Sequence, residues 1–458
     1  EKDLLAWTLA MGHAMTRAGL DLGDWRPDVV HKGHLLFVDA FRESRIKGVD
    51  STARTLRRGS LATQQASLPP WSWHHFDRRE AGMNWSTTPL GAGGAHRVTV
   101  PGCRRVLVIV PSIVAGTRLL DLLPLLNADY RVQTFFTQPE LCNHTEVFIK
   151  TIGGLTIPWE QALQHEFDLV LAASYRFIDR APGPVLVLPH GASALKSRIR
   201  VRHTAEPVHG LDRQLLMRDG KVHAAAIALS HQDELSVLTE SCPEAVDTAV
   251  VAGDICLDRM RASLPFRDQY RRTLGVRPDE TLVTISSTWT TESTFAKCPA
   301  LYRELPRIAK VAVVLHPYIW TVHGAWQVRS WLANCDVIVV PPEAGWQATM
   351  IASDVVVGDH GSTTQYAAAI SRRMLLATLP EVRKGSLAHA LGEVVPIYAG
   401  ELDEAVTAPG FAGLISSRLD RAGIILRRTM YRLLGMPEPE QVCSIARVPW
   451  PKPLSDDR

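Results

Sequence analysis

The segment VVGDHGSTTQYAAA, residues 356–369, places an acidic side chain, a glycine and three hydroxyls between an apolar run and an alanine-rich stretch. A strand that ends in small polar residues and leads into a helix commonly binds anions, because the free N–H groups and the positive end of the helix dipole attract phosphate. The hydroxyls of Ser362, Thr363 and Thr364 are therefore expected to hold a diphosphate. The simpler interpretation is that Ser362 or Thr363 only caps the helix.

A His-Gly pair follows a second apolar run, PVLVLP, and could supply a base. Gly191 lets the backbone turn tightly, which leaves the imidazole of His190 free at the tip of the strand. With an unperturbed pKa near 6.5, His190 could remove a proton from an attacking hydroxyl. Lys196 follows six residues later, where it could meet a phosphate. Alternatively, His190 is a helix-cap partner and Lys196 a solvated surface charge.

Short apolar runs alternate with helical or irregular segments between residues 104 and 381. This pattern is typical of a parallel sheet covered by helices on both faces, and in such sheets ligands bind at the carboxyl ends of the strands. Mostly polar residues stand at these ends. The candidate ligand-binding residues among them, beyond those named above, are Ser112, Ser230, Ser287, Thr288, His316, Asp359, Gly361 and Glu381.

Glu381 stands directly after Pro380, at the end of the last apolar run of the series. A carboxylate in this place can accept hydrogen bonds from both hydroxyls of a ribose, as an acid does after a nucleotide-binding strand. The other interpretation is a solvent-exposed turn residue.

The predicted fold class is α/β and GT-B-like, with two Rossmann-like, doubly wound parallel-sheet domains that face each other across a cleft. Residues 1–100 are expected to form a helical and irregular N-terminal extension. The first Rossmann-like domain is predicted over residues 101–255, on the acceptor side, and the second over residues 256–410, on the nucleotide-donor side. Residues 411–458 would form a C-terminal helix and a tail that crosses back.

The composition limits the class of protein. Hydrophobic residues make up 46% and charged residues 21% of the 458 residues, as in soluble globular proteins. A net charge of +3 suits a pocket for anionic ligands but is far from the dense basic patch of a nucleic-acid-binding protein. The apolar runs are shorter than the roughly 18–20 residues that span a bilayer.

The pattern of the cysteines and of the acidic residues favours a site without metal. The seven cysteines are scattered and form no CxxC pair, so neither a disulfide framework nor a zinc site is indicated, and a reducing cytoplasm fits best. No DxD cluster suggests a bound divalent ion. We therefore expect a cytoplasmic protein with a metal-independent site and no cofactor beyond a nucleotide-linked substrate.

Five motifs, in order over about residues 185–381, resemble those of the CDP-glycerol glycerophosphotransferase family, the teichoic-acid polymerase type, which has a GT-B fold. The motif HGASALK is similar to the family's His-Gly-Thr-Pro-Leu-Lys, with Ala192 and Ser193 in place of Thr-Pro, and His360-Gly361 stands where the family usually has Tyr. The five motifs are HGASALK at 190–196, GDICLD at 253–258, SSTW at 286–289, the His-Pro pair at 316–317 and SDVVVGDHGST at 353–363.

The resemblance implies a transferase with a CDP-linked donor that moves a polyol phosphate to a hydroxyl acceptor. His190 would be the general base, and His316 with the hydroxyl-rich loop, including Asp359, would hold the donor diphosphate. A nucleotide-sugar glycosyltransferase shares the fold and stays an alternative, as does a UDP-sugar epimerase, although Gln365 and Tyr366 stand where epimerases carry paired glutamates. A non-catalytic nucleotide- or polymer-binding member of the family is the third possibility.

The family's polymer acceptor is associated with the membrane, so the segment at residues 411–435 bears on localisation. It is predicted to form one long amphipathic helix with its arginines facing outward. Such a helix could touch an anionic membrane, which leaves open a peripheral contact at the inner membrane face. The favoured interpretation is a brace between the two domains.

Overall fold

The structure is a computed structural model that describes residues 89–90, 98–140, 143–197 and 210–454. Most of the N-terminal extension expected over residues 1–100 therefore lies outside the described residues. All described residues belong to one compact unit, which runs from residue 84 to residue 458.

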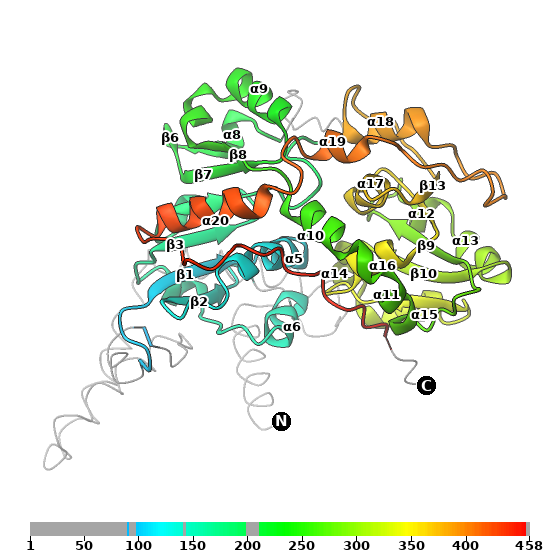
Figure 1. Ribbon diagram of the computed structural model, residues 1–458, viewed down its shortest axis with the longest axis horizontal. Coiled ribbons are helices and arrows are strands. Elements are labelled where there is room, and N and C mark those ends of the chain that lie inside the picture. Colours follow the sequence, from blue (N-terminus) through cyan, green and yellow to red (C-terminus); the bar gives the residue numbers. More distant parts are fainter. Residues whose placement is uncertain (1–88, 91–97, 141–142, 198–209, 455–458) are drawn as a thin grey trace, which may run out of the picture. The chain divides into compact units, whose positions relative to one another are not determined.

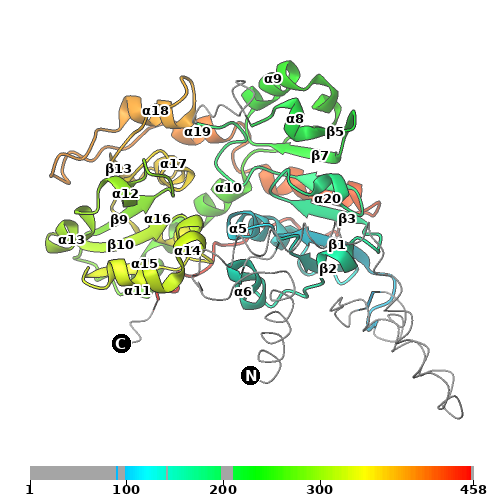
Figure 2. The same cartoon turned by 180° about the vertical axis from the view of Figure 1, so that it is seen from behind.

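The first sheet consists of six parallel strands in the order β2-β1-β3-β4-β7-β8. Its central strands β3 and β4 are short and entirely buried, because apolar side chains cover both faces, whereas the edge strands β2 and β8 are partly buried. Helices α5 and α6 pack on one face and α7 and α9 on the other. Figures 1 and 2 show α5, α6 and α9 around this sheet. The strands are β1 (Arg104–Ile109), β2 (Val132–Thr137), β3 (Leu169–Ala172), β4 (Val185–Val187), β7 (Ala224–Leu229) and β8 (Ala249–Val251), and the helices are α5 (Ile113–Leu122), α6 (Asn143–Thr151), α7 (Trp159–Ala162) and α9 (Gln232–Ser241).

The second sheet has five parallel strands in the order β11-β10-β9-β12-β13. Two separate apolar cores again cover its two faces. The strands are β9 (Leu282–Ser287), β10 (Lys310–Leu315), β11 (Val337–Val340), β12 (Val355–Gly358) and β13 (Arg373–Leu376). The helices of this half are α12 (Thr294–Lys297), α13 (Leu301–Glu304), α14 (Pro317–His323), α15 (Ala325–Leu332), α16 (Trp346–Ala352), α17 (Ser362–Ala369) and α18 (Leu387–Val394).

Helices α10 (Ile255–Ser263) and α11 (Arg267–Thr273) connect the two sheets, and α10 lies between them in Figure 1. Two doubly wound parallel sheets joined in this way form the GT-B-like α/β architecture that the sequence predicts. A small antiparallel pair, β5 (Met217–Arg218) with β6 (Lys221–Val222), follows the short helix α8 (Arg213–Leu216).

The terminal segment is not the single long helix that the sequence predicts. It forms α19 (Phe411–Ile415) and α20 (Ala422–Leu433), with a break between them in which Asp420 has a φ of 61°. The buried carboxylate of Asp258 in α10 accepts hydrogen bonds from the backbone N–H groups of Asp420 and Ala422, both at 2.8 Å. Asp258 therefore anchors the start of α20, a role that local helical spacing cannot reveal.

Helix α20 packs against the first sheet, where Leu426 and Met430 join its core. Of the arginines expected to face outward, Arg427 instead points inward and is only 6% exposed. Its guanidinium donates to the backbone carbonyl oxygens of Pro439 and Gln441, at 2.9 and 2.8 Å. This face of α20 is therefore occupied by the protein itself.

The tail after α20 connects the two sheets a second time. Ile445 still packs on the core of the first sheet, whereas Trp450 meets Tyr270 of α11 with ring centroids 5.1 Å apart. The backbone N–H of Leu454 then donates to the carbonyl oxygen of Val339 in β11, at 3.0 Å. This segment thus crosses from the first half of the molecule to the second.

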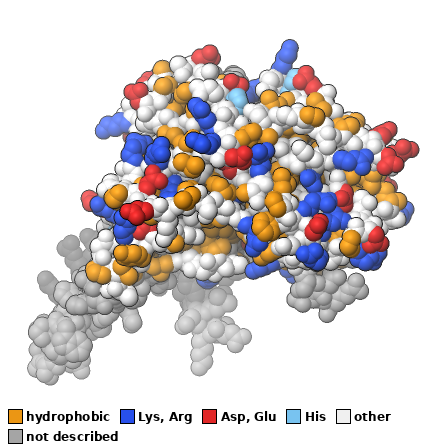
Figure 3. All heavy atoms as spheres, in the orientation of Figure 1, with side chains coloured by type: hydrophobic (Ala, Val, Ile, Leu, Met, Phe, Trp, Pro, Cys, Tyr) orange, Lys and Arg blue, Asp and Glu red, His pale blue; other side chains and the backbone are white. Residues whose placement is uncertain are grey.

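Basic and acidic side chains are interspersed on the face of the molecule shown in Figure 3. Within the described ranges, every helix is too short or too polar to cross a membrane.

The anchor at Asp258 predicts a pH dependence of stability. Burial raises the pKa of Asp258 to about 6, although the two N–H groups that it accepts from oppose this shift. The native state therefore holds an extra proton between about pH 4 and pH 6, and the stability that Asp258 contributes falls as pH rises through this window. Relative to Asp258→Asn, the free energy of unfolding of the wild type should fall by up to about 3 kcal/mol from pH 4 to pH 7.

Urea unfolding of both proteins at several pH values measures this difference, with the exposed Asp279→Asn as a control that should follow the wild type. Parallel curves for the wild type and Asp258→Asn would contradict the assignment.

Candidate functional site

The His-Gly loop after β4 and the hydroxyl-rich loop after β12 meet, although they belong to different sheets. A Cβ atom placed on Gly191 would lie 2.7 Å from the Oγ atom of Ser362, so only glycine fits here without displacing Ser362. Nearby, the backbone N–H of Arg383, after β13, donates to the carbonyl oxygen of Ser197 at 2.7 Å. The carboxyl ends of the two sheets therefore face each other at this point.

His190 is held with its Nε2 atom as the free acceptor. Its Nδ1 atom lies 3.2 Å from the carbonyl oxygen of Ala173, and because a carbonyl oxygen can only accept, Nδ1 must carry the proton. Burial by surrounding protein atoms and the nearby positive charge of Lys196 together lower the pKa of His190 to about 4, and His316 adds to this effect only when it is protonated. The residue is also exposed at the tip of the strand, so water offsets part of this effect, but the direction leaves a neutral imidazole at pH 7.

His316 has the opposite tautomer. It is the N-cap residue of α14, and its Nδ1 atom accepts a hydrogen bond from the backbone N–H of Tyr318 at 3.1 Å. Because Nδ1 accepts, the proton of the neutral ring is on Nε2. Burial lowers the pKa of His316 to about 4, which keeps the ring neutral. One histidine of the pair thus offers a proton acceptor and the other a proton donor.

The hydroxyl-rich loop leaves two hydroxyls available to a ligand. The N-cap residue of α17 is Gly361, so the simpler interpretation, in which Ser362 or Thr363 caps this helix, does not hold. Ser362 and Thr363 are half-buried, and their side chains make no hydrogen bond with any residue that the structure describes. Thr364, expected to bind diphosphate, is instead fully buried and donates to Ser286 Oγ at 3.2 Å, so its hydroxyl packs between helix and sheet.

Asp359, expected to contact a donor, has no exposed surface and acts as a frame for the neighbouring loops. Its Oδ2 atom accepts from the N–H and hydroxyl of Thr288, at 2.8 and 2.9 Å, and from the N–H of Thr294 at 3.0 Å. Its Oδ1 atom accepts from the N–H of Gly361 at 3.0 Å. Ser287 is buried as well and accepts from the N–H of Phe295. These side chains hold the site together and do not line it.

The other predicted residues lie in different surroundings. Ser112 caps α5 by accepting from the N–H of Ala115 at 3.3 Å, and Ser230 is 1% exposed. The Ser230 hydroxyl is therefore not presented to a ligand, whereas Ser112 is half-buried and holds the start of its own helix. Lys196 is close enough to His190 to lower its pKa, and Glu381 is exposed on the loop after β13. The structure thus brings His190, Lys196, His316 and the hydroxyls of the α17 loop together, with Glu381 at the margin.

Glu234 is a residue that the sequence reasoning missed, and it holds the loop that carries His190. Its buried carboxylate accepts from Ser193 Oγ at 2.6 Å, from the N–H of Ala194 at 2.8 Å and from the N–H of Ser230 at 2.7 Å. Ser193 is one of the two departures from the resembled family motif, and this bond gives it a function in the loop. Glu234 forms a capping box with His231, but a capping box is recognised in a sequence by Ser or Thr at the N-cap, so the sequence offered no clear signal for it.

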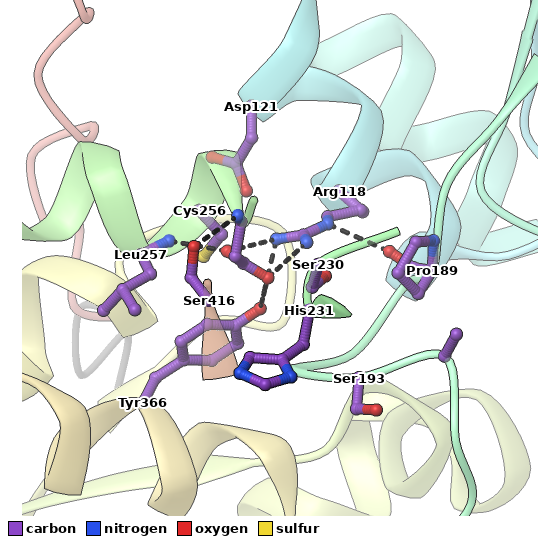
Figure 4. Close-up of polar contacts among 12 residues, drawn as sticks. Arg118, Asp121, Pro189, Ser193, Ser230, His231, Cys256, Leu257, Tyr366 and Ser416 are labelled. Carbon is purple, nitrogen blue, oxygen red and sulfur yellow. Dashed lines mark hydrogen bonds and ion pairs between the residues drawn. The ribbon is translucent and has the colours of Figure 1, made fainter. Parts of the chain in front are cut away.

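Arg118 is a second residue that sequence reasoning missed, and it connects the two halves of the site (Figure 4). Its guanidinium is 4% exposed and donates to both carboxylate oxygens of Asp254, at 2.6 and 3.3 Å. It also donates to the carbonyl oxygen of Pro189, at 3.0 Å, and to the hydroxyl of Tyr366, at 3.1 Å. Pro189 directly precedes His190, and Tyr366 lies one turn after Ser362, so a single side chain links the two loops.

A pocket of about 540 Å³ lies elsewhere, at the amino ends of β3 and β4. It is lined by residues 163–167 and 182–184, which precede these strands. Ligands of open parallel sheets bind at the opposite, carboxyl edge, so we do not assign the function to this pocket.

No protein-family model matches the chain. A stretch of 118 residues is 35% identical to glycogen synthase from two strains of Mycobacterium tuberculosis, and it covers 21% of this chain. The chain spans 28% of the length of these curated relatives.

Several solved structures have a backbone with low similarity to that of this chain. The wall teichoic acid polymerase TagF soaked with CDPG is 10% identical, with a TM-score of 0.45 over 72% of this chain and 88% of TagF. Anabaena HepE in complex with UDP and glucose is 12% identical, with a TM-score of 0.41 over 72% and 99%. The UDP-GlcNAc 2-epimerase from Neisseria meningitidis bound to UDP-GlcNAc is 16% identical, with a TM-score of 0.41 over 72% and 100%. The fold described above rests on this chain's own sheets.

The Arg118 link predicts a large difference between two arginines. Arg118→Ala leaves the buried Asp254 without its charge partner and should destabilise the protein by about 3–5 kcal/mol. Arg104→Ala removes an exposed ion pair with Asp168, 2.8 Å long, and should cost less than about 1 kcal/mol. Chemical unfolding measures both.

Tyr366→Phe is the milder test, because it removes only the hydroxyl between Arg118 and Asp254, and it should cost about 1–3 kcal/mol. If Arg118→Ala and Arg104→Ala proved equally stable, the link would not hold the two loops.

Proposed function

We propose that this chain is a transferase that takes a nucleotide-diphosphate donor and passes a group from it to a hydroxyl acceptor, with His190 as the general base. The observation that carries the proposal is the proximity of a proton-accepting His190, a proton-donating His316 and the two available hydroxyls of the α17 loop. Gly191 meets Ser362, and His316 is close enough to influence the pKa of His190. An acceptor hydroxyl needs the first of these and a leaving phosphate needs the other two.

The donor diphosphate would lie at the start of α17, where backbone N–H groups and the hydroxyls of Ser362 and Thr363 can neutralise its charge. The exposed Glu381 after β13 would accept from the ribose hydroxyls. Transfer of this kind depends mainly on positioning and charge stabilisation, so no covalent enzyme intermediate is required. We propose no cofactor beyond the donor and no metal ion.

A CDP-linked polyol phosphate is our first candidate for the donor, on the strength of the five motifs given above. The acceptor oxygen would bond to the phosphorus that carries the polyol, the P–O–P bond would break, and CMP would leave. His190 Nε2 would take the proton of the acceptor hydroxyl. Lys196, beside His190, would meet the negative charge of the phosphate.

Transfer of a sugar from a nucleotide sugar is the second candidate, and the similarity of 118 residues to glycogen synthase favours it. In this case the acceptor oxygen would bond to the anomeric carbon and the nucleoside diphosphate would leave. The same His190 would take the proton, so both candidates use one arrangement of residues. Binding of nucleotide without turnover of any donor would instead indicate a non-catalytic protein.

Isothermal titration with CDP-glycerol, CDP, UDP and UDP-N-acetylglucosamine tests the donor site. Ser362→Ala removes a hydrogen bond to a charged phosphate and should weaken the binding of the preferred nucleotide about tenfold or more. Ser330→Ala, an exposed serine of α15, is the matched control and should leave the dissociation constant unchanged. Addition of EDTA should not affect binding.

Selectivity for cytidine would support the first candidate and selectivity for uridine the second. Absence of binding by any nucleotide would overturn the proposal.

The state of His190 predicts how transfer depends on pH. A general base must be neutral, so activity falls as pH falls through the pKa of His190, which is lowered in the free protein. A bound diphosphate adds negative charge beside the ring and raises this pKa. The acid limb of kcat/KM, which reports the free enzyme, should therefore lie well below pH 6.5, and that of kcat should lie at higher pH.

His190→Ala should lower kcat about 10²–10⁴-fold and leave donor binding in calorimetry nearly unchanged. Superimposable acid limbs for kcat and kcat/KM, or a variant that keeps its kcat, would rule out His190 as the base.

A further inference from the structure

Two exposed aromatic rings lie next to His316 and have no part in the function proposed above. Trp289, after β9, is 43% exposed, and Tyr318, in the first turn of α14, is 42% exposed. Their ring centroids are 4.8 Å apart with 35° between the ring planes. The ring of His316 lies 6.4 Å from Trp289 and 6.3 Å from Tyr318. Together, Trp289 and Tyr318 form an aromatic platform beside the proton-donating histidine.

The order of the strands places this platform relative to the proposed donor site. Along the carboxyl edge, β10 and β9 carry Tyr318 and Trp289, β12 carries the hydroxyl-rich loop, and β13 carries Glu381. The platform and Glu381 therefore lie on opposite sides of the hydroxyls of Ser362 and Thr363. A nucleoside whose ribose is held by Glu381 extends away from the platform, which leaves the platform to the other reactant.

Helix α14, which carries Tyr318, also lies near the half of the molecule that carries His190. Helix α14 lies on the side of the second sheet that is turned toward α5 and α6 in both views (Figures 1 and 2). The influence of His316 on the pKa of His190 agrees with this placement. A molecule lying on the platform could thus reach the base with one of its hydroxyls.

We propose that Trp289 and Tyr318 bind a pyranose ring of the acceptor. A pyranose has a face of C–H groups that packs on the π-cloud of an aromatic ring, and an edge of hydroxyls that stays free to reach His190. Trp and Tyr suit this task because one part of each is apolar and another polar. An acceptor without a ring, such as glycerol, could not use this surface. The proposal rests on the proposed function, because the position of the donor decides which reactant faces the platform.

Saturation-transfer NMR with the full chain and no nucleotide tests the platform. The probes are the methyl glycosides of glucose, galactose, mannose and N-acetylglucosamine, with maltotriose, and with glycerol as the ringless control. At least one ring sugar should receive saturation at its C–H protons, and glycerol should not. Trp289→Ala should weaken the binding of that sugar at least tenfold, and Trp289→Phe should retain most of the binding.

Trp326→Ala is the matched control, because Trp326 is an exposed tryptophan of the neighbouring α15, with 77% of its surface accessible. It should bind the sugar as the wild type does. Circular dichroism should show both alanine variants folded, since both side chains lie largely at the surface.

Three results would overturn the proposal. The first is that no ring sugar binds, and the second is that Trp326→Ala weakens sugar binding as much as Trp289→Ala does. The third is that Trp289→Ala weakens the binding of CDP or UDP in calorimetry and leaves the binding of the sugar unchanged. The last result would assign the platform to the base of the nucleotide. Failure of the transferase function gives a different pattern, in which ring sugars still bind through Trp289 but no nucleotide binds.

Discussion

The buried guanidinium of Arg118 is the interaction on which the candidate site depends. A charge without solvent must find partners for its donors, and Arg118 finds them in the connector, in the loop before His190 and in α17. These three segments belong to different parts of the chain, so satisfying one side chain sets their relative positions. The contact between Gly191 and Ser362 lies beside this link, and Ala192 adds apolar packing to it, because its side chain is buried in the core of the second half.

Buried carboxylates also fix the positions of loops, each for a smaller part of the structure. Glu234 holds the loop after β4, Asp359 holds the loops after β9 and β12, and Asp258 holds the start of α20. Each accepts from backbone N–H groups of a segment that has no regular secondary structure to pair them. The loops at the carboxyl edges are thereby fixed by acids that touch no ligand. The groups left for chemistry are the two histidines, Lys196 and the two hydroxyls of the α17 loop.

The two histidines differ only through the backbone groups that meet their Nδ1 atoms. A carbonyl oxygen at His190 and an N–H group at His316 give opposite tautomers, so one neutral pair provides a base and a donor. This arrangement suits both candidate donors, because each reaction moves one proton from the acceptor and places charge on phosphate. The aromatic platform beside His316 bears on the acceptor instead, since a sugar ring can use it and a bare polyol cannot.

The sequence by itself determined the fold class, because short buried strands alternating with helices leave few arrangements other than parallel sheets covered on both faces. It also located the carboxyl ends of the strands, and with them His190, His316 and Ser362, since these depend only on where each apolar run stops. Only the tertiary structure decided which polar residues at those ends face a ligand. Asp359 and Thr364 turn inward and Ser362 does not, and nothing within their shared segment distinguishes them. Arg118 and Glu234 escaped notice, and Asp258 was seen only as part of a motif, because the partners that give these side chains a role lie far away in the chain. A buried charge has a definite role only when its partners are in place.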